Sequence, residues 1–194
     1  MRSFFLKKNK DIYLHSEMSK PRNILDQQHL QITIHRLCQQ LIENHDNFSE
    51  TVLIGLQPRG VKLCSKIKGI LENKFTTSKL AFGSLDISFY RDDFRRRDNP
   101  LIVNSTELNV STEGKKVVLI DDVLFTGRSV RAAMDALYDY GRPKSVELLV
   151  LIDRRLSRHV PIQPNYVGLT IDVVADERVS VEWGDNERVI LKSS

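Results

Sequence analysis

The chain has 194 residues, of which 41% are hydrophobic and 28% are charged, and only 9 are glycine and 6 are proline. This composition is typical of a globular protein and excludes a fibrous or mainly disordered chain. The longest uninterrupted apolar stretch, Leu148–Ile152, is far shorter than the roughly 20 residues of a membrane-spanning helix, so no membrane partner is expected. A net charge of +4 suits nucleic acid and a small polyanionic ligand equally well.

Residues 1–23 are polar, and we expect them to form a loosely attached extension before a single domain over residues 24–194. Lysines directly follow the apolar cluster Met1–Leu6, which leaves no apolar core for a signal peptide. The two cysteines, Cys38 and Cys64, lie in apolar, helix-like settings without metal-ligand spacing. These features predict a cytoplasmic protein.

The first half of this domain is predicted to contain two helices and two strands. Asp26 can cap a first helix, whose apolar residues at helical spacing are Leu30, Ile34, Leu37, Cys38 and Leu41. Thr51–Leu56 is typical of a buried strand, and a second helix is expected after the turn Pro58-Arg59-Gly60. Leu80–Tyr90 is the next predicted strand, and a long polar loop from Arg91 to about Lys115 follows it. This loop contains the charged run Arg95–Arg97, which we interpret as solvated.

The second half continues the alternation of strands and helices. A short strand, Val117–Ile120, precedes a helix that begins at about Ser129 and ends before Gly141 and Pro143. The further predicted strands are Val146–Ile152, Tyr166–Leu169, Val179–Trp183 and Arg188–Leu191. Strands that alternate with helices indicate the α/β class, with a mostly parallel sheet covered by helices.

One segment joins the end of a buried strand to the start of a helix. The strand runs into Asp121 and Asp122, and a loop with Thr126 and Gly127 then leads to Ser129. The free N–H groups at a helix start and the two hydroxyls form an anion site, and glycine lets a phosphate approach the backbone. Two carboxylates would repel a phosphate unless its ligand also carries hydroxyl groups or a cation. A sugar phosphate with Mg²⁺ meets both conditions.

The two aspartates are expected to have different roles, because adjacent side chains of a strand face opposite ways. One would accept hydrogen bonds from ribose hydroxyls, and the other would orient water around Mg²⁺, which prefers oxygen ligands and keeps several waters. We assign no side chain as a direct metal ligand. A pair of aspartates often simply ends a strand, but the combination with the loop favours a sugar-phosphate site.

The segment Asp121–Ser129 resembles the phosphoribosyl-diphosphate (PRPP) motif of the type I phosphoribosyltransferases. It is most similar to the PyrR branch, whose members are bifunctional pyrimidine-operon regulators and uracil phosphoribosyltransferases. The resemblance covers roughly Ile24 to Gly168 and continues through Asp86–Asp93, Met134–Leu137, Gly141–Pro143 and Val150–Arg154. The residues that would bind PRPP are Asp121, Asp122, Val123, Leu124, Phe125, Thr126, Gly127, Arg128 and Ser129.

The resemblance implies transfer of a phosphoribosyl group from PRPP to uracil, which gives UMP and pyrophosphate. It also implies the type I fold with a small hood and a flexible loop, whose closure would exclude water. Substrate-associated Mg²⁺ would lie near the two aspartates. The residues that would act in catalysis are Asp121, Asp122, Arg91 and Tyr90. The pyrophosphate loop would be Pro58, Arg59 and Gly60, with proline where the family usually has threonine.

The resemblance further implies a homo-oligomer, a dimer or larger, that binds an mRNA leader in response to uridine nucleotides. The RNA-binding residues would be His35, Arg36, Arg155, Arg158 and His159. Two alternatives stay open. One is an RNA-binding attenuator with weak or no transferase activity, which Pro58 and the divergent segment Ile171–Val174 would fit. The other is a 6-oxopurine phosphoribosyltransferase, which Phe125 disfavours because those enzymes have aspartate there.

Overall fold

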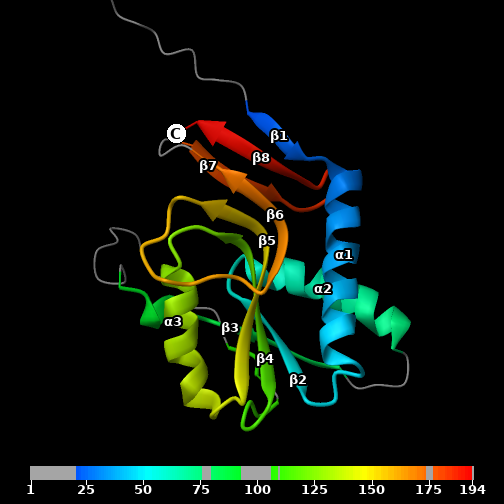
Figure 1. Cartoon of the computed structure of the whole chain (residues 1–194), viewed down its shortest axis with the longest axis vertical. Helices are drawn as coiled ribbons and strands as arrows, with labels where there is room; N and C mark the ends of the chain where they lie inside the picture. The colour runs from blue at the N-terminus through cyan, green and yellow to red at the C-terminus, as the bar shows by residue number, and fades with distance from the viewer. Residues whose placement is uncertain (1–20, 76–79, 93–105, 109, 174–176, 194) are drawn as a thin grey trace, which may run out of the picture.

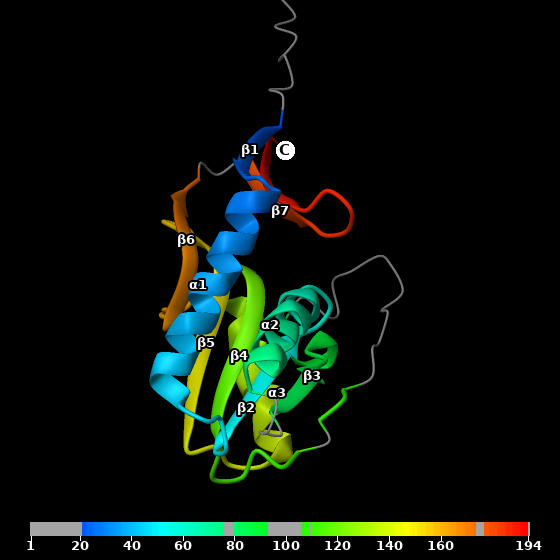
Figure 2. The same cartoon turned by 90° about the vertical axis from the view of Figure 1, so that its right-hand side faces the viewer.

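A computed structural model describes residues 21–75, 80–92, 106–108, 110–173 and 177–193 of the chain. The strands among these residues form a five-stranded sheet with the order β3-β2-β4-β5-β6 and a three-stranded sheet with the order β1-β8-β7. Figure 1 shows the smaller sheet above the larger one, and Figure 2 shows it beyond the upper end of helix α1. We call the smaller sheet, β1, β7 and β8, the hood.

The five-stranded sheet is parallel throughout, with β4 at its centre. Its strands are β2 (Thr51–Leu56), β3 (Ala81–Leu85), β4 (Lys116–Leu124), β5 (Ser145–Arg155) and β6 (Tyr166–Asp172). Three helices cover it: α1 (Gln27–His45), α2 (Gly60–Lys74) and α3 (Arg128–Leu137). The α/β class and the parallel sheet predicted from the sequence are confirmed.

Strand alternation divides the apolar core into two layers. Val118 and Ile120 of β4 belong to the cluster that includes the buried faces of α1 and α2. Val117 and Leu119 belong to the cluster that includes α3. Because successive side chains of a strand face opposite ways, these β-branched and leucine runs bury both faces of the sheet. Figure 1 accordingly shows α1 and α2 on one side of the sheet and α3 on the other.

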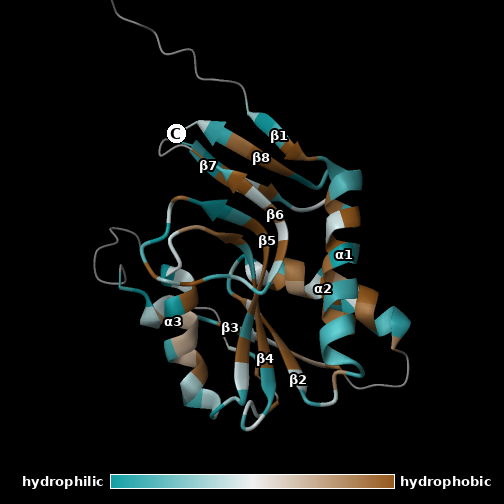
Figure 3. Cartoon of the chain, viewed as in Figure 1, coloured by the Kyte–Doolittle hydropathy of each residue, from teal (hydrophilic) through white to brown (hydrophobic). Residues whose placement is uncertain are grey.

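The hood joins the two ends of the chain. Its strands are β1 (Arg22–Leu25), β7 (Glu177–Glu182) and β8 (Arg188–Ser193), and both neighbouring pairs are antiparallel. Figure 3 shows β8 mainly in hydrophobic colour, and Val189 and Leu191 are part of the same apolar cluster as α1 and α2. Strand β1 begins at Arg22, inside the segment 1–23 that we predicted to be an N-terminal extension. Residues 1–20 lie outside the described residues.

Local side chains explain where several elements begin and end. Asp26 caps α1 as predicted, since its Oδ1 accepts a hydrogen bond of 2.9 Å from the backbone N–H of His29. The strand predicted over Leu80–Tyr90 is shorter and ends at Leu85, and residues Ser88–Tyr90 form a short 3₁₀ helix, η1. Asp86 starts this turn, because its Oδ1 accepts from the N–H of Ser88 at 2.8 Å.

The central strand β4 is longer than predicted. It continues through both aspartates to Leu124, because β5 runs beside it as far as the pair Leu124 and Asp153. Aspartate is rare in strands, but this pairing outweighs its low preference. Most of the predicted Arg91–Lys115 loop, including Arg95–Arg97, lies outside the described residues. No helix in the described part of the chain is long and apolar enough to cross a membrane.

Candidate active site at the carboxyl ends of the strands

A cavity of about 660 Å³ lies at the carboxyl ends of β2 and β4. Parallel α/β sheets bind their ligands at this edge. The walls come from residues 56–59 after β2, from parts of the segment 87–92, and from the continuous segment 121–130. Arg154 at the end of β5 and residues 177–179 of the hood complete it. The predicted PRPP motif and the predicted pyrophosphate loop thus face one space.

Both aspartates of the motif line this cavity. The side chain of Asp122 is buried, and its backbone N–H donates a 2.9 Å hydrogen bond to Oδ1 of Asp121. Strand alternation predicts that the two side chains point in opposite directions. Both nevertheless line the cavity, because the cavity surrounds the end of β4 and is lined by every residue from 121 to 130. Burial, followed by the charge of Asp122, raises the pKa of Asp121. Burial also raises the pKa of Asp122, and the nearby guanidinium of Arg59 opposes both shifts.

The loop after the aspartates places the start of α3 at the cavity. Gly127 caps the helix with φ of 86°, a left-handed conformation that suits glycine. The hydroxyl of Ser129 accepts a 3.0 Å hydrogen bond from Nη1 of Arg91. Backbone N–H groups at the first turn of a helix, together with a cation, favour a bound anion. The cavity thus brings a helix start, a hydroxyl and a guanidinium together at Thr126–Ser129, where the sequence predicts an anion site.

The loop after β2 forms the opposite wall. The peptide bond between Gln57 and Pro58 is cis, and Nε2 of Gln57 donates to the hydroxyl of Ser84 at 3.0 Å. Arg59 follows and lines the cavity. Gly60 then begins α2 so close to β4 that an added Cβ would lie 2.1 Å from the carbonyl oxygen of Ile120. The absence of a side chain at Gly60 lets this loop approach the aspartates.

Tyr90 is the one predicted catalytic residue that does not line the cavity. Because β3 ends early and η1 turns the chain, the hydroxyl of Tyr90 donates to the carboxylate of Asp139. Its half-buried ring packs against the apolar cluster on the α3 side. The structure therefore corrects the predicted position of Tyr90, while Arg91, the next residue, lies in the cavity wall.

Arg154 is a residue of the cavity whose importance the sequence analysis missed. Its side chain is 5% exposed, and its guanidinium carbon lies 4.1 Å from the centroid of the Phe125 ring. Within the described part of the chain, its buried Nε has no hydrogen-bond partner. The nearby Glu177 comes from the hood. Only the resemblance to the family drew attention to Asp153-Arg154, because no local pattern signals an arginine buried by distant strands.

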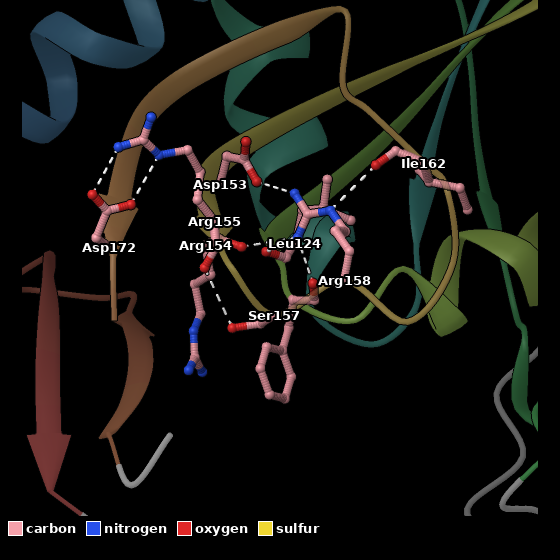
Figure 4. A network of polar contacts seen from close by, with 9 residues as sticks. Leu124, Asp153, Arg154, Arg155, Ser157, Arg158, Ile162 and Asp172 are labelled. Atoms are coloured by element: carbon pink, nitrogen blue, oxygen red, sulfur yellow. Dashed lines mark hydrogen bonds and ion pairs between the residues drawn. The ribbon is translucent and has the colours of Figure 1, made fainter. Parts of the chain in front are cut away.

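The arginines predicted to bind RNA make contacts within the chain. Arg36 donates to the carbonyl oxygens of Val167 and Gly168 on β6. Arg155 forms a two-point ion pair with Asp172, with Nε to Oδ1 at 2.8 Å and Nη2 to Oδ2 at 2.7 Å (Figure 4). Arg158 is at the centre of a further network. Of the two predicted histidines, His35 is exposed beside the carbonyl of Gln31, and the backbone N–H of His159 donates to the carbonyl oxygen of Thr126.

The acidic groups fit a metal that the substrate brings with it. Among the residues that the structure describes, no group of three or more His, Cys, Asp or Glu side chains could hold a metal ion. Asp121 and Asp122 offer carboxylate oxygens, which Mg²⁺ prefers, and substrate oxygens and waters would supply the remaining ligands.

Comparison with known proteins identifies the family. The model of the phosphoribosyl transferase domain matches residues 22–184. The chain is 41% identical over 178 residues to the bifunctional protein PyrR of Caldicellulosiruptor bescii, covering 90% of this chain and 97% of that protein. It is 40% identical to the bifunctional protein PyrR of Desulfosudis oleivorans, with 85% and 91% covered. The chain belongs to the PyrR family. The family prediction made from the sequence is confirmed.

Solved structures support the fold of this PyrR family member. A hypoxanthine phosphoribosyltransferase of Staphylococcus aureus matches with a TM-score of 0.59 and 22% identity, covering 84% of this chain and 83% of that chain. A hypoxanthine-guanine phosphoribosyltransferase of Bacillus anthracis matches with a TM-score of 0.63 and 17% identity, covering 89% and 97%. At this identity the likeness shows a shared fold, the type I phosphoribosyltransferase fold predicted from the sequence.

Proposed function

We propose that this PyrR family member transfers the 5-phosphoribosyl group of PRPP to uracil, and that it also regulates pyrimidine operons by binding mRNA. The observation that carries the proposal is one cavity that combines the acidic pair Asp121–Asp122 with the helix start at Thr126–Ser129. PRPP needs both, since its 5-phosphate is an anion and its ribose carries hydroxyl donors. Relatives that are 37–41% identical and share the name PyrR favour uracil over a purine.

The chain would bind PRPP at two points. The N–H groups at the start of α3 and the hydroxyls of Thr126 and Ser129 would bind the 5-phosphate. Asp121 and Asp122 would accept hydrogen bonds from the ribose hydroxyls. Holding the sugar at both points fixes its anomeric carbon relative to the base. The reaction between two molecules then becomes effectively unimolecular, because the reacting groups are already oriented.

The departing pyrophosphate needs positive charge. Arg59 in the loop after β2 and Arg91 beside Ser129 both line the cavity and would stabilise the charge that develops as the glycosidic bond breaks. Mg²⁺, when bound with PRPP, would add positive charge on the pyrophosphate oxygens. Asp121 and Asp122 would hold it through water and substrate oxygens, as the donor set described above allows.

The uracil would lie near Phe125 and Arg154. Arg154 lines the cavity and is largely buried, so a carbonyl oxygen of the base would accept from a guanidinium that is already desolvated. The exposed ring of Phe125 offers an apolar surface beside it. A neutral base with two carbonyl oxygens suits this combination of a donor and an apolar surface.

We also propose that residues 24–194 form a single domain, that the protein is cytoplasmic, and that it forms homo-oligomers, dimers or larger. The shared apolar cluster of the hood, α1 and α2 supports the single domain. The oligomer rests on the resemblance to the family, and the cellular location rests on the sequence features of the N-terminal segment and of the two cysteines.

The proposal is tested by incubating the full chain with PRPP, Mg²⁺ and either uracil, hypoxanthine or guanine. UMP formation with uracil, and little product with the purines, is the expected result. Turnover of hypoxanthine or guanine without UMP formation would favour the purine alternative. The regulatory activity is tested with a pyrimidine-operon leader RNA in a filter-binding assay, where UMP should increase retention and salt should reduce it. UMP-dependent RNA binding without any UMP synthesis would favour the attenuator alternative.

A further inference from the structure

Arg158 ties the segment 158–162 to the loop between β4 and α3. Figure 4 shows its guanidinium among main-chain oxygens and the carboxylate of Asp153. Nη1 donates to the carbonyl oxygen of Leu124 at 3.3 Å and also to that of Phe125. The same atom donates to the carbonyl of Arg154 at 2.9 Å, and Nε donates to that of Ile162 at 3.2 Å. The guanidinium of Arg158 thus contacts the ends of β4 and β5 and also the segment 158–162.

Backbone contacts join the same two segments, and we call the contacts of residues 158–160 with residues 124–126 the seam. The N–H of His159 donates to the carbonyl oxygen of Thr126 at 2.9 Å, and the N–H of Val160 approaches the same oxygen at 3.3 Å. Three consecutive carbonyls, those of Leu124, Phe125 and Thr126, therefore all accept from residues 158–160. This seam covers the side of the loop that faces away from the cavity, since residues 124–127 line the cavity and residues 158–160 do not.

The seam determines where the N–H groups of the loop point. In a trans peptide unit the carbonyl and the following N–H point in opposite directions. Because the carbonyls of residues 124–126 are held by residues 158–160, the N–H groups of Phe125, Thr126 and Gly127 point to the other side, toward the cavity. An anion that binds there meets donors that are already oriented, so little ordering of the loop remains to oppose binding.

We propose that Arg158 is a positioning residue that orients the phosphate-binding loop and thereby strengthens PRPP binding without touching the substrate. This inference rests on the proposed function, because it assumes that the loop binds the 5-phosphate of PRPP. It assigns Arg158 a role that differs from the RNA contact expected from the resemblance, since its side chain is only 22% exposed and its donors already meet acceptors within the chain.

Replacing Arg158 with lysine separates the effect of the shape of the guanidinium from the effect of its positive charge. Arginine presents five N–H donors in a rigid planar fork, whereas lysine has a single ammonium group on a flexible chain. Arg158→Lys keeps a positive charge beside Asp153 but cannot reach several carbonyls at once. Arg188→Ala is the matched control, because Arg188 in the hood also forms an ion pair, with Nε 2.8 Å from Oε2 of Glu182, and does not line the cavity.

The test measures kcat and the KM values of PRPP and uracil for the full chain, for Arg158→Lys, for Arg158→Ala and for Arg188→Ala. We expect Arg158→Lys to raise KM for PRPP about tenfold, equivalent to losing about one charge-assisted hydrogen bond, while KM for uracil changes little. Arg188→Ala should keep both KM values. An unchanged KM for PRPP in Arg158→Lys would overturn the proposal, and a simultaneous loss of affinity for the leader RNA would identify Arg158 as an RNA contact instead.

A second readout does not depend on turnover. Hydrogen exchange of the backbone amides of His159 and Val160, which donate to the carbonyl oxygen of Thr126, should be faster in Arg158→Lys than in the wild type and in Arg188→Ala. If Arg158→Ala fails to fold, Arg158→Lys still decides the question. A wild-type chain that does not turn over PRPP would refute the proposed function, whereas unchanged exchange at His159 and Val160 would refute the positioning role by itself.

Discussion

Gly60 lies so close to Ile120 that a Cβ on Gly60 would be 2.1 Å from the carbonyl oxygen of Ile120 and 3.0 Å from Cα of Asp121. The contact joins the start of α2 to the strand that carries the acidic pair. We predict that Gly60→Ala destabilises the fold by roughly 1–3 kcal/mol, as overpacking against a rigid backbone does. It should also weaken PRPP turnover, because β4 must shift next to Asp121. Urea unfolding and steady-state kinetics measure the two effects.

The same helix provides the control. Gly69 is exposed in α2, and an added Cβ would meet no atom within 4 Å. Gly69→Ala should therefore stabilise the protein by about 0.5–1 kcal/mol through the better helix propensity of alanine. If both substitutions change the free energy of unfolding in the same direction, the close approach of Gly60 to β4 is not the reason that a side chain at residue 60 would be unfavourable.

Replacing Asp121 with asparagine should lower activity and raise stability at neutral pH. The variant replaces a carboxyl oxygen, an acceptor for the ribose hydroxyls, with an N–H donor, which should reduce kcat/KM roughly tenfold to a hundredfold. Burial and the charge of Asp122 raise the pKa of Asp121 above its ordinary value of 3.8. The stability linked to this carboxyl is thus full below about pH 3.8 and is lost as the pH rises through the raised pKa.

Asparagine does not ionise, so Asp121→Asn should be more stable than the wild type at about pH 8, by about 1 kcal/mol or more. Its advantage should shrink as the pH falls toward 4. Urea unfolding of both proteins without ligand, at several pH values, measures this difference. A difference that stays constant with pH would contradict the assignment of a raised pKa to Asp121.

His45 is predicted to make stability fall in weak acid. Its fully buried ring lies 3.1 Å from the hydroxyl of Thr51, 3.1 Å from that of Tyr166 and 3.3 Å from Oε2 of Glu147. Burial lowers the pKa of His45 below its ordinary value of 6.5, and the charge of Glu147 opposes this shift. The remaining charges that act on it are those of Lys116, which lowers the pKa further, and Asp46, which raises it.

Because the pKa of His45 is lowered on folding, its contribution to stability is present above about pH 6.5 and is lost as the pH falls through the lowered value. We expect His45→Gln to be less stable than the wild type at pH 7.5, but with a smaller loss of stability between pH 7.5 and 5.5. His35→Gln, at an exposed position of the same helix, should keep the wild-type loss. Equal losses in all three proteins would exclude His45 as the source.

The base subsite can be probed at Arg154. Arg154→Met keeps an unbranched side chain beside Phe125 but removes the donor, so KM for uracil should rise roughly tenfold or more, as expected for a lost hydrogen bond to a charged group. KM for PRPP should change little, because methionine keeps an apolar contact with Phe125, the residue of the phosphate-binding loop that Arg154 touches. An equal rise in both KM values would show that Arg154 supports the whole cavity and not the base subsite.

Local patterns predicted those parts of the fold that depend on neighbouring residues. Strand β2 was predicted with its observed bounds because it is apolar throughout and followed by a proline turn. The cap at Asp26 was predicted because its carboxylate acts within one helical turn. The loop from Asp121 to Ser129 was found for the same reason, since all its groups are contiguous in sequence.

Contacts between distant residues could not be predicted in this way. The pairing of β1 with β8 joins the two ends of the chain, and polar residues such as Arg22 and Asn23 carry no signal of it. Likewise, nothing near Arg158 indicates that its guanidinium reaches the carbonyls of Leu124 and Phe125. Tyr90 was assigned to catalysis by the resemblance to the family, whereas Asp86 ends the strand early and the hydroxyl of Tyr90 donates to Asp139.

The central claim is that the acidic pair and the start of α3 together bind PRPP. The most direct measurement is calorimetric titration of PRPP with Mg²⁺ into the full chain, into the Asp121→Asn/Asp122→Asn double variant, and into Asp185→Asn, a control in the exposed turn of the hood. We predict that the wild type and Asp185→Asn bind PRPP with the same affinity and that the double variant binds it much more weakly. Equal binding by all three proteins, or no binding by the wild type, would contradict the claim.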